Sequence, residues 1–327
     1  MAPMRSRNAG VDFGIVLILL LLASRPGSTA LACNHSVPAR DRTLTMTTAL
    51  VLAGGGSLGA VEAGMLRALV REGVVADFVV GASVGAVNGA YFAGDPTPEG
   101  VARLESLWCM LKREHIFPMG LSSLLGLLGV HGHLVSAQGL KRLLESHLPY
   151  RRLEEARVPI HVVATELATG DEVVLSAGSA IDAVLASAAI PGVYPSVTID
   201  GRELVDGGVT NNTPISTAIR LGADRVIVLP TGFACALRKA PASAIGKALH
   251  SLSHLVARQL VHDIERFAPR VALCVVPPLC PLDVSPYDYD RSPVLIDRAA
   301  ESTQAWIAGG GLARSDAGPG MLAPHAH

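Results

Sequence analysis

A serine between two glycines is the residue of this sequence best suited to act as a nucleophile. Ser83 lies in the segment Gly81-Ala82-Ser83-Val84-Gly85, which follows the apolar run 78–80 and precedes a stretch of small residues. At a turn from strand to helix, this spacing holds a serine in a strained conformation that exposes its Oγ, while the glycines avoid collisions. The N-terminus of the following helix favours negative charge on the reacting oxygen. The pattern predicts Ser83 as a catalytic nucleophile, with Gly81 and Gly85 shaping its turn.

A glycine-rich loop precedes that serine in the chain. Between the apolar run 49–53 and a helix-like stretch stand Gly54, Gly55, Gly56, Ser57 and Gly59. Backbone N–H groups of such a loop can converge on the oxyanion of a tetrahedral intermediate, and losing one donor typically costs about 10²–10³ in rate. We expect this loop to form an oxyanion hole.

The same glycines also match a dinucleotide-binding fingerprint. Gly54, Gly56 and Gly59 have the spacing Gly-x-Gly-x-x-Gly, and Asp77 lies about 20 residues further on. A ribose-binding acid should close the second strand, whereas Asp77 opens the run 78–80, whose far end leads to Ser83. This order disfavours dinucleotide binding, and no cofactor is predicted.

A hydrolytic serine needs a base, and Asp206 is the first candidate. It follows Leu204 and Val205 and begins the segment Asp206-Gly207-Gly208. In open α/β sheets, ligands bind beyond the carboxyl ends of strands, so we expect the Asp206 carboxylate at that edge. Taken alone, Asp-Gly is also an ordinary turn sequence.

Histidines offer the alternative of a Ser-Asp-His triad. His250, His254 and His262 follow Asp206 in the chain, as the order of such a triad requires. They fall within 243–267, which reads as one long helix, whereas a triad histidine usually comes from a loop beyond a strand. We therefore expect them to be residues of a helix face.

The elements that must position these residues alternate along the chain. Buried-strand patterns occur at 49–53, 78–80, 160–165, 204–205, 225–229 and 271–276, and 172–175 reads as a hairpin partner of 160–165. Helical patterns occur at 60–71, 86–94, 97–113, 137–147, 180–189, 214–221, 243–267 and 293–307. This alternation predicts one α/β domain, a three-layer sandwich with a mostly parallel central sheet.

Composition and charge exclude some classes of function. The 327 residues carry 27 Lys and Arg against 28 Asp and Glu, so no global field attracts a nucleic-acid backbone. Hydrophobic residues make up 50% and charged residues 17%, which suits a protein that meets lipid. The five cysteines are odd in number and lack zinc-type spacing, so neither a disulfide framework nor a cysteine metal site is predicted. Nothing in the sequence specifies an oligomeric state.

Residues 1–45 differ from the rest. Arg5 and Arg7 precede the apolar run 13–23, and Ala30-Leu31-Ala32 offers a cleavage site, which is the layout of a secretory signal. Alternatively, the natural chain starts at Met46, just before the first strand. The first reading predicts export and the second a cytoplasmic or membrane-peripheral protein. We expect the folded domain at 46–308 and a disordered tail at 309–327.

The stretch 116–135 breaks the pattern of alternating elements. It holds many leucines, glycines and serines and little charge, so it reads either as an apolar flap over a site or as a buried connecting helix. His131 and His133 flank a glycine there, but no carboxylate or second histidine pair lies nearby in the sequence, and we expect no metal.

Three motifs taken in order resemble the patatin-like phospholipase domain. They are Gly-Gly-Gly-x-x-Gly at 54–59, Gly-x-Ser-x-Gly at 81–85 and Asp-Gly-Gly at 206–208. The segments GASVGAVNGAYFAG at 81–94 and ASAAIPG at 186–192 extend the likeness, which covers about residues 47 to 230. The resemblance implies a patatin-like three-layer fold and a lipid acyl hydrolase acting on phospholipid or another acyl lipid.

The resemblance also implies roles for single residues. In that family a serine and an aspartate act as a dyad without histidine, so Ser83 would be the nucleophile and Asp206 the base. The amides of Gly55, Gly56 and Ser57 would form the oxyanion hole. One departure is Leu58, because many members carry Arg or Lys there, and head-group preference is not carried over. A non-catalytic lipid-binding module of the same fold and a Ser-Asp-His esterase are the rival functions.

Overall fold

The computed structural model describes residues 46–116, 133–232 and 244–313, apart from 281, 283, 286 and 287. In the helix that begins at residue 244, the side chains of 244–246, 248–250 and 252 are also outside the description. The expectations for residues 1–45, for most of the stretch 116–135 with His131, and for the tail beyond 313 fall on residues outside the described part. None of the helices within the described ranges combines the length and apolarity needed to span a membrane.

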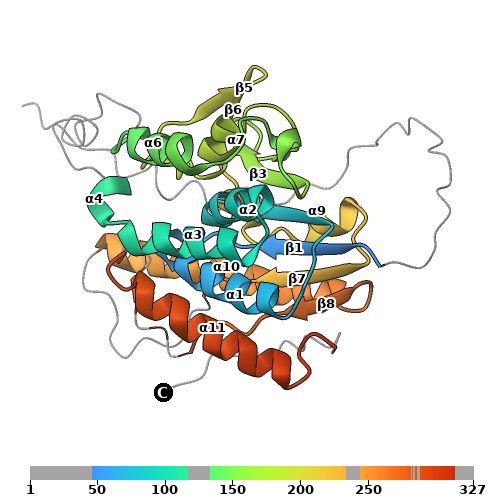
Figure 1. The fold of residues 1–327 in the computed structure, drawn as a ribbon. Helices are drawn as coiled ribbons and strands as arrows, with labels where there is room; N and C mark the ends of the chain where they lie inside the picture. The colour runs from blue at the N-terminus through green and yellow to red at the C-terminus, as the bar shows by residue number, and fades with distance from the viewer. Residues whose placement is uncertain are drawn as a thin grey trace, which may run out of the picture. The chain divides into compact units, whose positions relative to one another are not determined.

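A sheet forms the centre of the fold, as Figure 1 shows. Within the described residues it has eight strands. Its strands are β1 (Thr48–Leu52), β2 (Phe78–Ala82), β3 (Ile160–Glu166), β4 (Glu172–Leu175), β5 (Val197–Ile199), β6 (Arg202–Asp206), β7 (Arg225–Leu229) and β8 (Ala272–Val275). Hydrogen-bonded neighbours follow the order β5-β6-β3-β2-β1-β7-β8, and β4 pairs with β3 as well. The sheet is parallel from β3 through β2, β1 and β7 to β8.

The remaining strands run antiparallel. β4 pairs with β3 as the expected hairpin, β6 also runs antiparallel to β3, and β5 and β6 form a second hairpin. Asp200 and Gly201 join β5 to β6 and both have positive φ, at 49° and 76°. Positive φ at both central residues is the geometry of a type I′ turn, which matches the twist of a two-residue hairpin.

Helices and short 3₁₀ turns account for the other described elements. The helices are α1 (Gly59–Arg71), α2 (Val84–Gly94), α3 (Pro98–Met110), α4 (Arg113–Ile116), α6 (Gln138–His147), α7 (Ala180–Ser187), α8 (Gly208–Asn211), α9 (Ile215–Arg220), α10 (Ala244–Phe267) and α11 (Ser292–Ala308). The 3₁₀ turns are η2 (Gly56–Leu58) and η3 (Leu153–Glu155). The helix expected at 97–113 is divided, because the backbone becomes extended at Leu111.

Alternating side chains of the central strands pack on opposite faces of the sheet. Leu50 and Leu52 of β1 join the larger hydrophobic cluster, together with residues of α1, α2, α3 and α11. Ala49 and Val51 join the other cluster, which includes residues of α9 and α10. Figure 1 shows α1, α3 and α11 side by side on their face. The structure is therefore the expected three-layer α/β sandwich with a mostly parallel central sheet.

The packed chain extends past residue 308. The carbonyl oxygen of Leu312 accepts a hydrogen bond of 2.8 Å from the Arg225 guanidinium at the start of β7. Leu312 is thus bonded to the first residue of β7.

Candidate active site

Ser83 occupies a strained position between β2 and α2. Its φ is 54° and its ψ is −125°, a region that residues with a side chain rarely adopt. The two flanking glycines allow the tight turn. A Cβ on Gly81 would lie 2.4 Å from the carbonyl oxygen of Gly85, and a Cβ on Gly85 would lie 2.3 Å from that of Leu52. The turn therefore requires glycine at both positions, as expected for a nucleophile elbow.

The Ser83 hydroxyl contacts a buried carboxylate. Ser83 Oγ donates a hydrogen bond of 2.7 Å to Asp206 Oδ2, although the two residues are 123 positions apart. The other oxygen, Oδ1, accepts the backbone N–H of Gly208 at 2.7 Å. Asp206 is 6% exposed, and this burial raises the pKa of its carboxyl from 3.8 to about 6, while the bonds from Ser83 and Gly208 act in the opposite direction. A carboxyl of this kind is suited to exchanging a proton near neutral pH.

Two strands that end against each other bring Ser83 and Asp206 together. Val163 of β3 pairs with Ala82 and with Val174, and the next residue, Ala164, pairs with Asp206 and with Val173. A strand has room for one neighbouring strand along each of its two edges. Because β4 lies along one edge of β3, β2 and β6 must both lie along the other. They run in opposite directions and finish at consecutive residues of β3.

This arrangement corrects the reason for expecting Asp206 at the site. From the sequence, Asp206 is expected at the site because the carboxyl ends of parallel strands meet at one edge of a sheet. β6 is antiparallel to β3, so its direction alone would send its end to the opposite edge. The register brings Asp206 to Ser83, because β6 stops where β2 stops.

Ser187, the last residue of α7, anchors the elbow. Its Oγ accepts the backbone N–H of Ser83 at 2.9 Å and donates to the carbonyl oxygen of Val163 at 2.5 Å. The Ser187 side chain is fully buried, and its own carbonyl oxygen accepts the N–H of Gly207. Ser187 therefore links both halves of the Ser83–Asp206 pair to β3. The sequence placed it within a motif but did not indicate this role.

The loop 54–59 presents three consecutive unpaired amides. Among the residues that the structure describes, the N–H groups of Gly55, Gly56 and Ser57 have no hydrogen-bond acceptor. The N–H of Gly54 is bonded to the carbonyl oxygen of Asn212, and that of Gly59 to the carbonyls of the 3₁₀ turn η2. Gly54 and Gly59 therefore shape the loop, whereas the three amides between them are available to an anion.

Asn212 and Thr231 hold that loop beside Ser83. The carbonyl oxygen of Gly54 accepts hydrogen bonds from Asn212 Nδ2 at 3.3 Å and from Thr231 Oγ1 at 2.8 Å. A Cβ on Gly54 would lie 2.4 Å from Asn212 Oδ1 and 3.1 Å from the Cβ of Ser83. The loop thus lies against both the asparagine and the serine. The sequence did not single out Asn212 or Thr231, because a buried polar side chain with a partner 158 or 177 positions away has no local signature.

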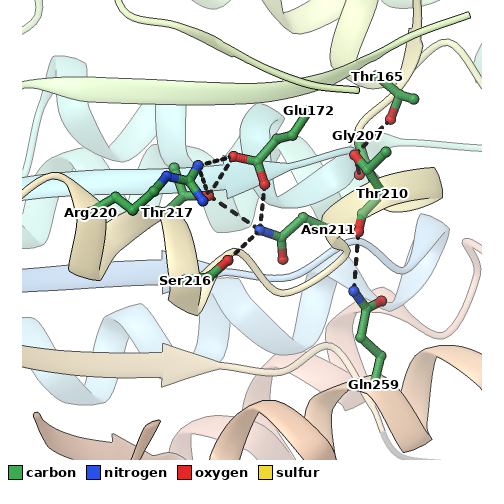
Figure 2. Close-up of polar contacts among 9 residues, drawn as sticks. All are labelled: Thr165, Glu172, Gly207, Thr210, Asn211, Ser216, Thr217, Arg220 and Gln259. Atoms are coloured by element: carbon green, nitrogen blue, oxygen red, sulfur yellow. Dashed lines mark hydrogen bonds and ion pairs between the residues drawn. The ribbon is translucent and has the colours of Figure 1, made fainter. Parts of the chain in front are cut away.

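Hydrogen bonds also fix the chain that follows Asp206, as Figure 2 shows. Thr165 Oγ1 of β3 donates to the carbonyl oxygen of Asp206 at 2.9 Å. It also lies 2.9 Å from the Oγ1 of Thr210 (Figure 2). Gln259 of α10 donates from Nε2 to the carbonyl oxygen of Thr210 at 3.1 Å. The short helix α8 is therefore held from the sheet and from α10.

Glu172 of β4 makes several of the other polar contacts in Figure 2. Its carboxylate accepts hydrogen bonds from Asn211 Nδ2 at 2.6 Å and from Thr217 Oγ1 at 2.8 Å, and it pairs with Arg220. Asn211 ends α8, and the other two partners belong to α9. The contacts join β4 to both helices, so they stabilise the segment that begins at Asp206.

The alternatives considered from the sequence find little support in the geometry. Asp77 Oδ2 accepts the N–H of Thr48 at 2.7 Å, at the end of β1 opposite the glycine loop. Asp77 therefore holds the start of β1 and does not lie where a ribose-binding acid would. Neither Ser83 nor Asp206 has a histidine partner among the described residues. His254 and His262 lie on α10 as expected, and the side chain of His250 is outside the described part.

Leu58 does not point to the site, and the described residues provide no metal-binding group. Leu58 is 9% exposed and belongs to the larger hydrophobic cluster, so its side chain packs into the core. Within the described ranges, histidine, cysteine, aspartate and glutamate residues form no group that could hold a metal ion.

Comparison with known proteins assigns the chain to a family. A family model for patatin-like phospholipase matches residues 50–219. Patatin-like phospholipase domain-containing protein 7 from Mus musculus is 31% identical over 186 residues, which is 56% of this chain and 13% of that protein. Lysophospholipase NTE1 from Mycosarcoma maydis is 26% identical over 195 residues, which is 57% of this chain and 10% of that protein. The match thus spans a small part of these longer relatives.

Among solved structures, human GIVD cytosolic phospholipase A2 aligns with 84% of this chain and 60% of its own, at 16% identity and a TM-score of 0.42. This weak likeness adds nothing to the assignment, which rests on the family model. Because that model covers more than half of the 327 residues, the resemblance found in the three motifs is confirmed. The chain belongs to the patatin-like phospholipase family.

Proposed function

We propose that the protein is a lipid acyl hydrolase, a serine carboxylic-ester hydrolase that uses Ser83 and Asp206 as a catalytic dyad. The observation that carries the proposal is the 2.7 Å hydrogen bond from Ser83 Oγ to the buried carboxylate of Asp206. A serine hydroxyl is a weak nucleophile until an adjacent base accepts its proton. Asp206 stands within the distance that such a proton transfer requires.

The reaction proceeds through an acyl-enzyme. Ser83 Oγ attacks the ester carbonyl carbon while its proton passes to Asp206. The tetrahedral intermediate carries its negative charge on the former carbonyl oxygen, which the amides of Gly55, Gly56 and Ser57 bind. When the intermediate collapses, the C–O bond to the alcohol breaks and the alcohol takes the proton from Asp206.

Water completes the turnover. Asp206 accepts a proton from a water molecule as its oxygen attacks the acyl carbon, and a second tetrahedral intermediate forms on the same three amides. Its collapse releases the fatty acid and returns the proton to Ser83 Oγ. Every proton transfer uses groups of this chain, so the mechanism needs neither a metal nor a cofactor.

The proposed substrates are phospholipids or simpler acyl lipids. The family supports this class, as do the names of its relatives, a patatin-like phospholipase domain-containing protein from Mus musculus and a lysophospholipase from Mycosarcoma maydis. A composition with 50% hydrophobic and 17% charged residues is consistent with contact with lipid. No nucleic-acid partner is proposed.

Labelling with a fluorophosphonate ester, followed by mapping of the modified residue, tests the proposal. Ser83 is expected to carry the phosphonyl group, and Ser83→Ala to abolish both labelling and hydrolysis of a p-nitrophenyl ester. Ser106→Ala is the matched control, because Ser106 is an exposed serine on α3 whose Oγ bonds only to its own helix. Labelling at another residue, or full hydrolysis by Ser83→Ala, would overturn the proposal.

The same assay separates the rival functions. A lipid-binding module without catalysis would bind phospholipid vesicles but hydrolyse neither p-nitrophenyl esters nor lysophospholipid. A Ser-Asp-His esterase would lose activity by a factor of about 10³ or more on replacement of one histidine of α10. The dyad predicts that His250→Ala, His254→Ala and His262→Ala each keep kcat within about threefold of the wild type.

A further inference from the structure

Glu62 is a fully buried carboxyl directly behind the glycine loop. It lies in the first turn of α1, the helix that follows the loop, and its exposed fraction is 0%. Oε2 accepts a hydrogen bond of 2.7 Å from Asn88 Nδ2. Oε1 is buried and has no partner within the described structure. Glutamate is almost never fully buried unless it is paired with a cation, so this position calls for an explanation.

Asn88 connects Glu62 to both helices that begin at the site. Its Nδ2 also donates to the carbonyl oxygen of Gly59 at 2.9 Å, at the start of α1. Its Oδ1 accepts the indole N–H of Trp108 of α3 at 2.9 Å. Asn88 itself belongs to α2, which starts immediately after Ser83. The two N–H bonds of the amide are therefore both used, and they tie the end of the glycine loop to the helix of the nucleophile.

Close packing makes this junction sensitive to small shifts. A Cβ on Gly59 would lie 2.5 Å from Val84, 2.7 Å from Trp108 and 3.1 Å from Asn88. The first turns of α1 and α2 thus touch, with Trp108 covering them. A displacement of either helix would change the separation between Ser83 Oγ and the three free amides of the loop.

The environment of Glu62 favours its uncharged form. Burial is the main cause that raises the pKa of Glu62 well above its ordinary value, and only Asn88 and the Ala53 amide act against it. The neighbouring charges on α1, α3 and α11 bond elsewhere, because Arg67 pairs with Glu105 and Asp297. Tyr91 of α2 donates its hydroxyl to Leu143. An ionised carboxylate here would lie unpaired in a low-dielectric interior and would oppose negative charge on a nearby oxyanion.

We propose that Glu62 is a positioning residue for the oxyanion hole. It orients the Asn88 amide, and Asn88 fixes Gly59 and with it the spacing between the glycine loop and Ser83. The inference rests on the proposed hydrolase function and deepens it. It also predicts that ionisation of Glu62 weakens catalysis.

Steady-state kinetics on a soluble p-nitrophenyl ester test this role with matched variants. Glu62→Leu removes the acceptor of Asn88, and kcat is expected to fall about 10- to 100-fold with KM within about threefold, as for a small misplacement of catalytic groups. Glu62→Gln retains an acceptor oxygen without a charge and is expected to restore at least a third of the wild-type kcat at pH 7. Glu105→Gln, which replaces a partly buried glutamate of raised pKa on α3, is the control and should leave kcat unchanged.

The pH profile distinguishes positioning from a purely structural contribution. Wild-type kcat is expected to decline on the alkaline side as Glu62 ionises, and Glu62→Gln should lack that decline. Thermal unfolding of each variant checks that the fold is intact. The inference is overturned if Glu62→Gln loses as much kcat as Glu62→Leu, or if Glu62→Gln and the wild type share the same alkaline decline.

A fluorescence titration tests the inference independently of hydrolysis. The chain has two tryptophans, so Trp306→Phe leaves Trp108 as the only one. Because burial raises the pKa of Glu62, the emission of Trp108 should change at a pH above the range in which an exposed glutamate ionises, and adding Glu62→Gln should remove that transition. If the wild type hydrolyses no ester, the proposed function fails, and the titration alone then tests the role of Glu62. That inference is overturned if the wild type shows no transition, or if the transition survives Glu62→Gln.

Discussion

The backbone N–H of Ser83 donates to the Oγ of Ser187 at 2.9 Å. The same Oγ donates to Val163 of β3, so one hydroxyl both accepts from the elbow and bonds to the sheet. The strained backbone at Ser83 persists only because neighbouring groups hold it, and Ser187 is the one side chain that bonds its N–H.

Ser187→Ala should therefore reduce kcat more than it reduces substrate binding. Leaving the Ser83 N–H unsatisfied is expected to cost about 1–3 kcal/mol of stability and to lower kcat about 10-fold or more at nearly constant KM. Ser179→Ala is the control, because Ser179 caps the same helix by accepting the Asp182 N–H and its loss costs about 1 kcal/mol. Urea unfolding and ester kinetics check both variants. Equal kcat in the two would assign Ser187 to stability alone.

The activity should depend on pH through Asp206. Burial raises the pKa of this carboxyl to about 6, and only the ionised form can accept the proton of Ser83. We expect kcat/KM for a neutral ester to fall about tenfold per pH unit below pH 6 and to rise no further just above it. Assays between about pH 4.5 and pH 8 measure this. A profile that stays flat to pH 4.5 would contradict the assignment of Asp206 as the base.

The same carboxyl should make the folded state less stable as the pH rises. Its pKa is 3.8 in the unfolded reference and about 6 when folded, so the folded state binds the proton more tightly. That stabilising contribution is fully present below about pH 4 and is lost as the pH rises through 6. The loss amounts to about 3 kcal/mol, since one pKa unit corresponds to about 1.4 kcal/mol.

Asp206→Asn does not titrate, so it exposes this effect. The free energy of unfolding of the variant, measured relative to wild type, is expected to rise by about 2–3 kcal/mol between pH 4 and pH 7. Parallel denaturant titrations at the two pH values cancel the contributions of other groups. A difference that stays constant would mean that the carboxyl is solvated like an exposed aspartate.

Leu58 should not tolerate the cation that many family members carry. Its side chain is 9% exposed and packs into the main cluster, so Leu58→Arg is expected to lower the stability by about 1–3 kcal/mol without raising kcat. Leu58→Met, which conserves volume, should cost less than about 1.5 kcal/mol. Chemical denaturation and kcat measurements test both changes. A stable Leu58→Arg variant with increased kcat would show that a cation can act from this position.

Local patterns predicted the elements that carry Ser83 and the glycine loop. Each motif lies between an apolar run and a helical repeat, so β1, α1, β2 and α2 follow from neighbouring residues. The direction of β6 did not follow, because a strand's neighbours are set by pairing across the chain. β5 was missed as well, since its three residues are not buried and show no apolar run.

The polar residues that hold Ser83 and the glycine loop in place could not be predicted from sequence patterns. Ser187 and Asn212 act through partners 104 and 158 positions away, and neither stands in a spacing that signals a role. Glu62 is a charged residue type in an amphipathic helix and would be assigned to the solvent face. Its complete burial depends on α2 and α3 covering that turn of α1.

The length of the hairpin of β5 and β6 determines where Asp206 lies along β3. Its two-residue turn at Asp200 and Gly201 pairs Ile199 with Arg202, and four further residues lead from Arg202 to Asp206. Side chains alternate between the faces of a strand, so one residue inserted after this turn would advance Asp206 by about 3.4 Å and turn it to the opposite face. An insertion or deletion in this surface hairpin would therefore take the Asp206 carboxylate away from Ser83 while leaving residues 81–85 unchanged.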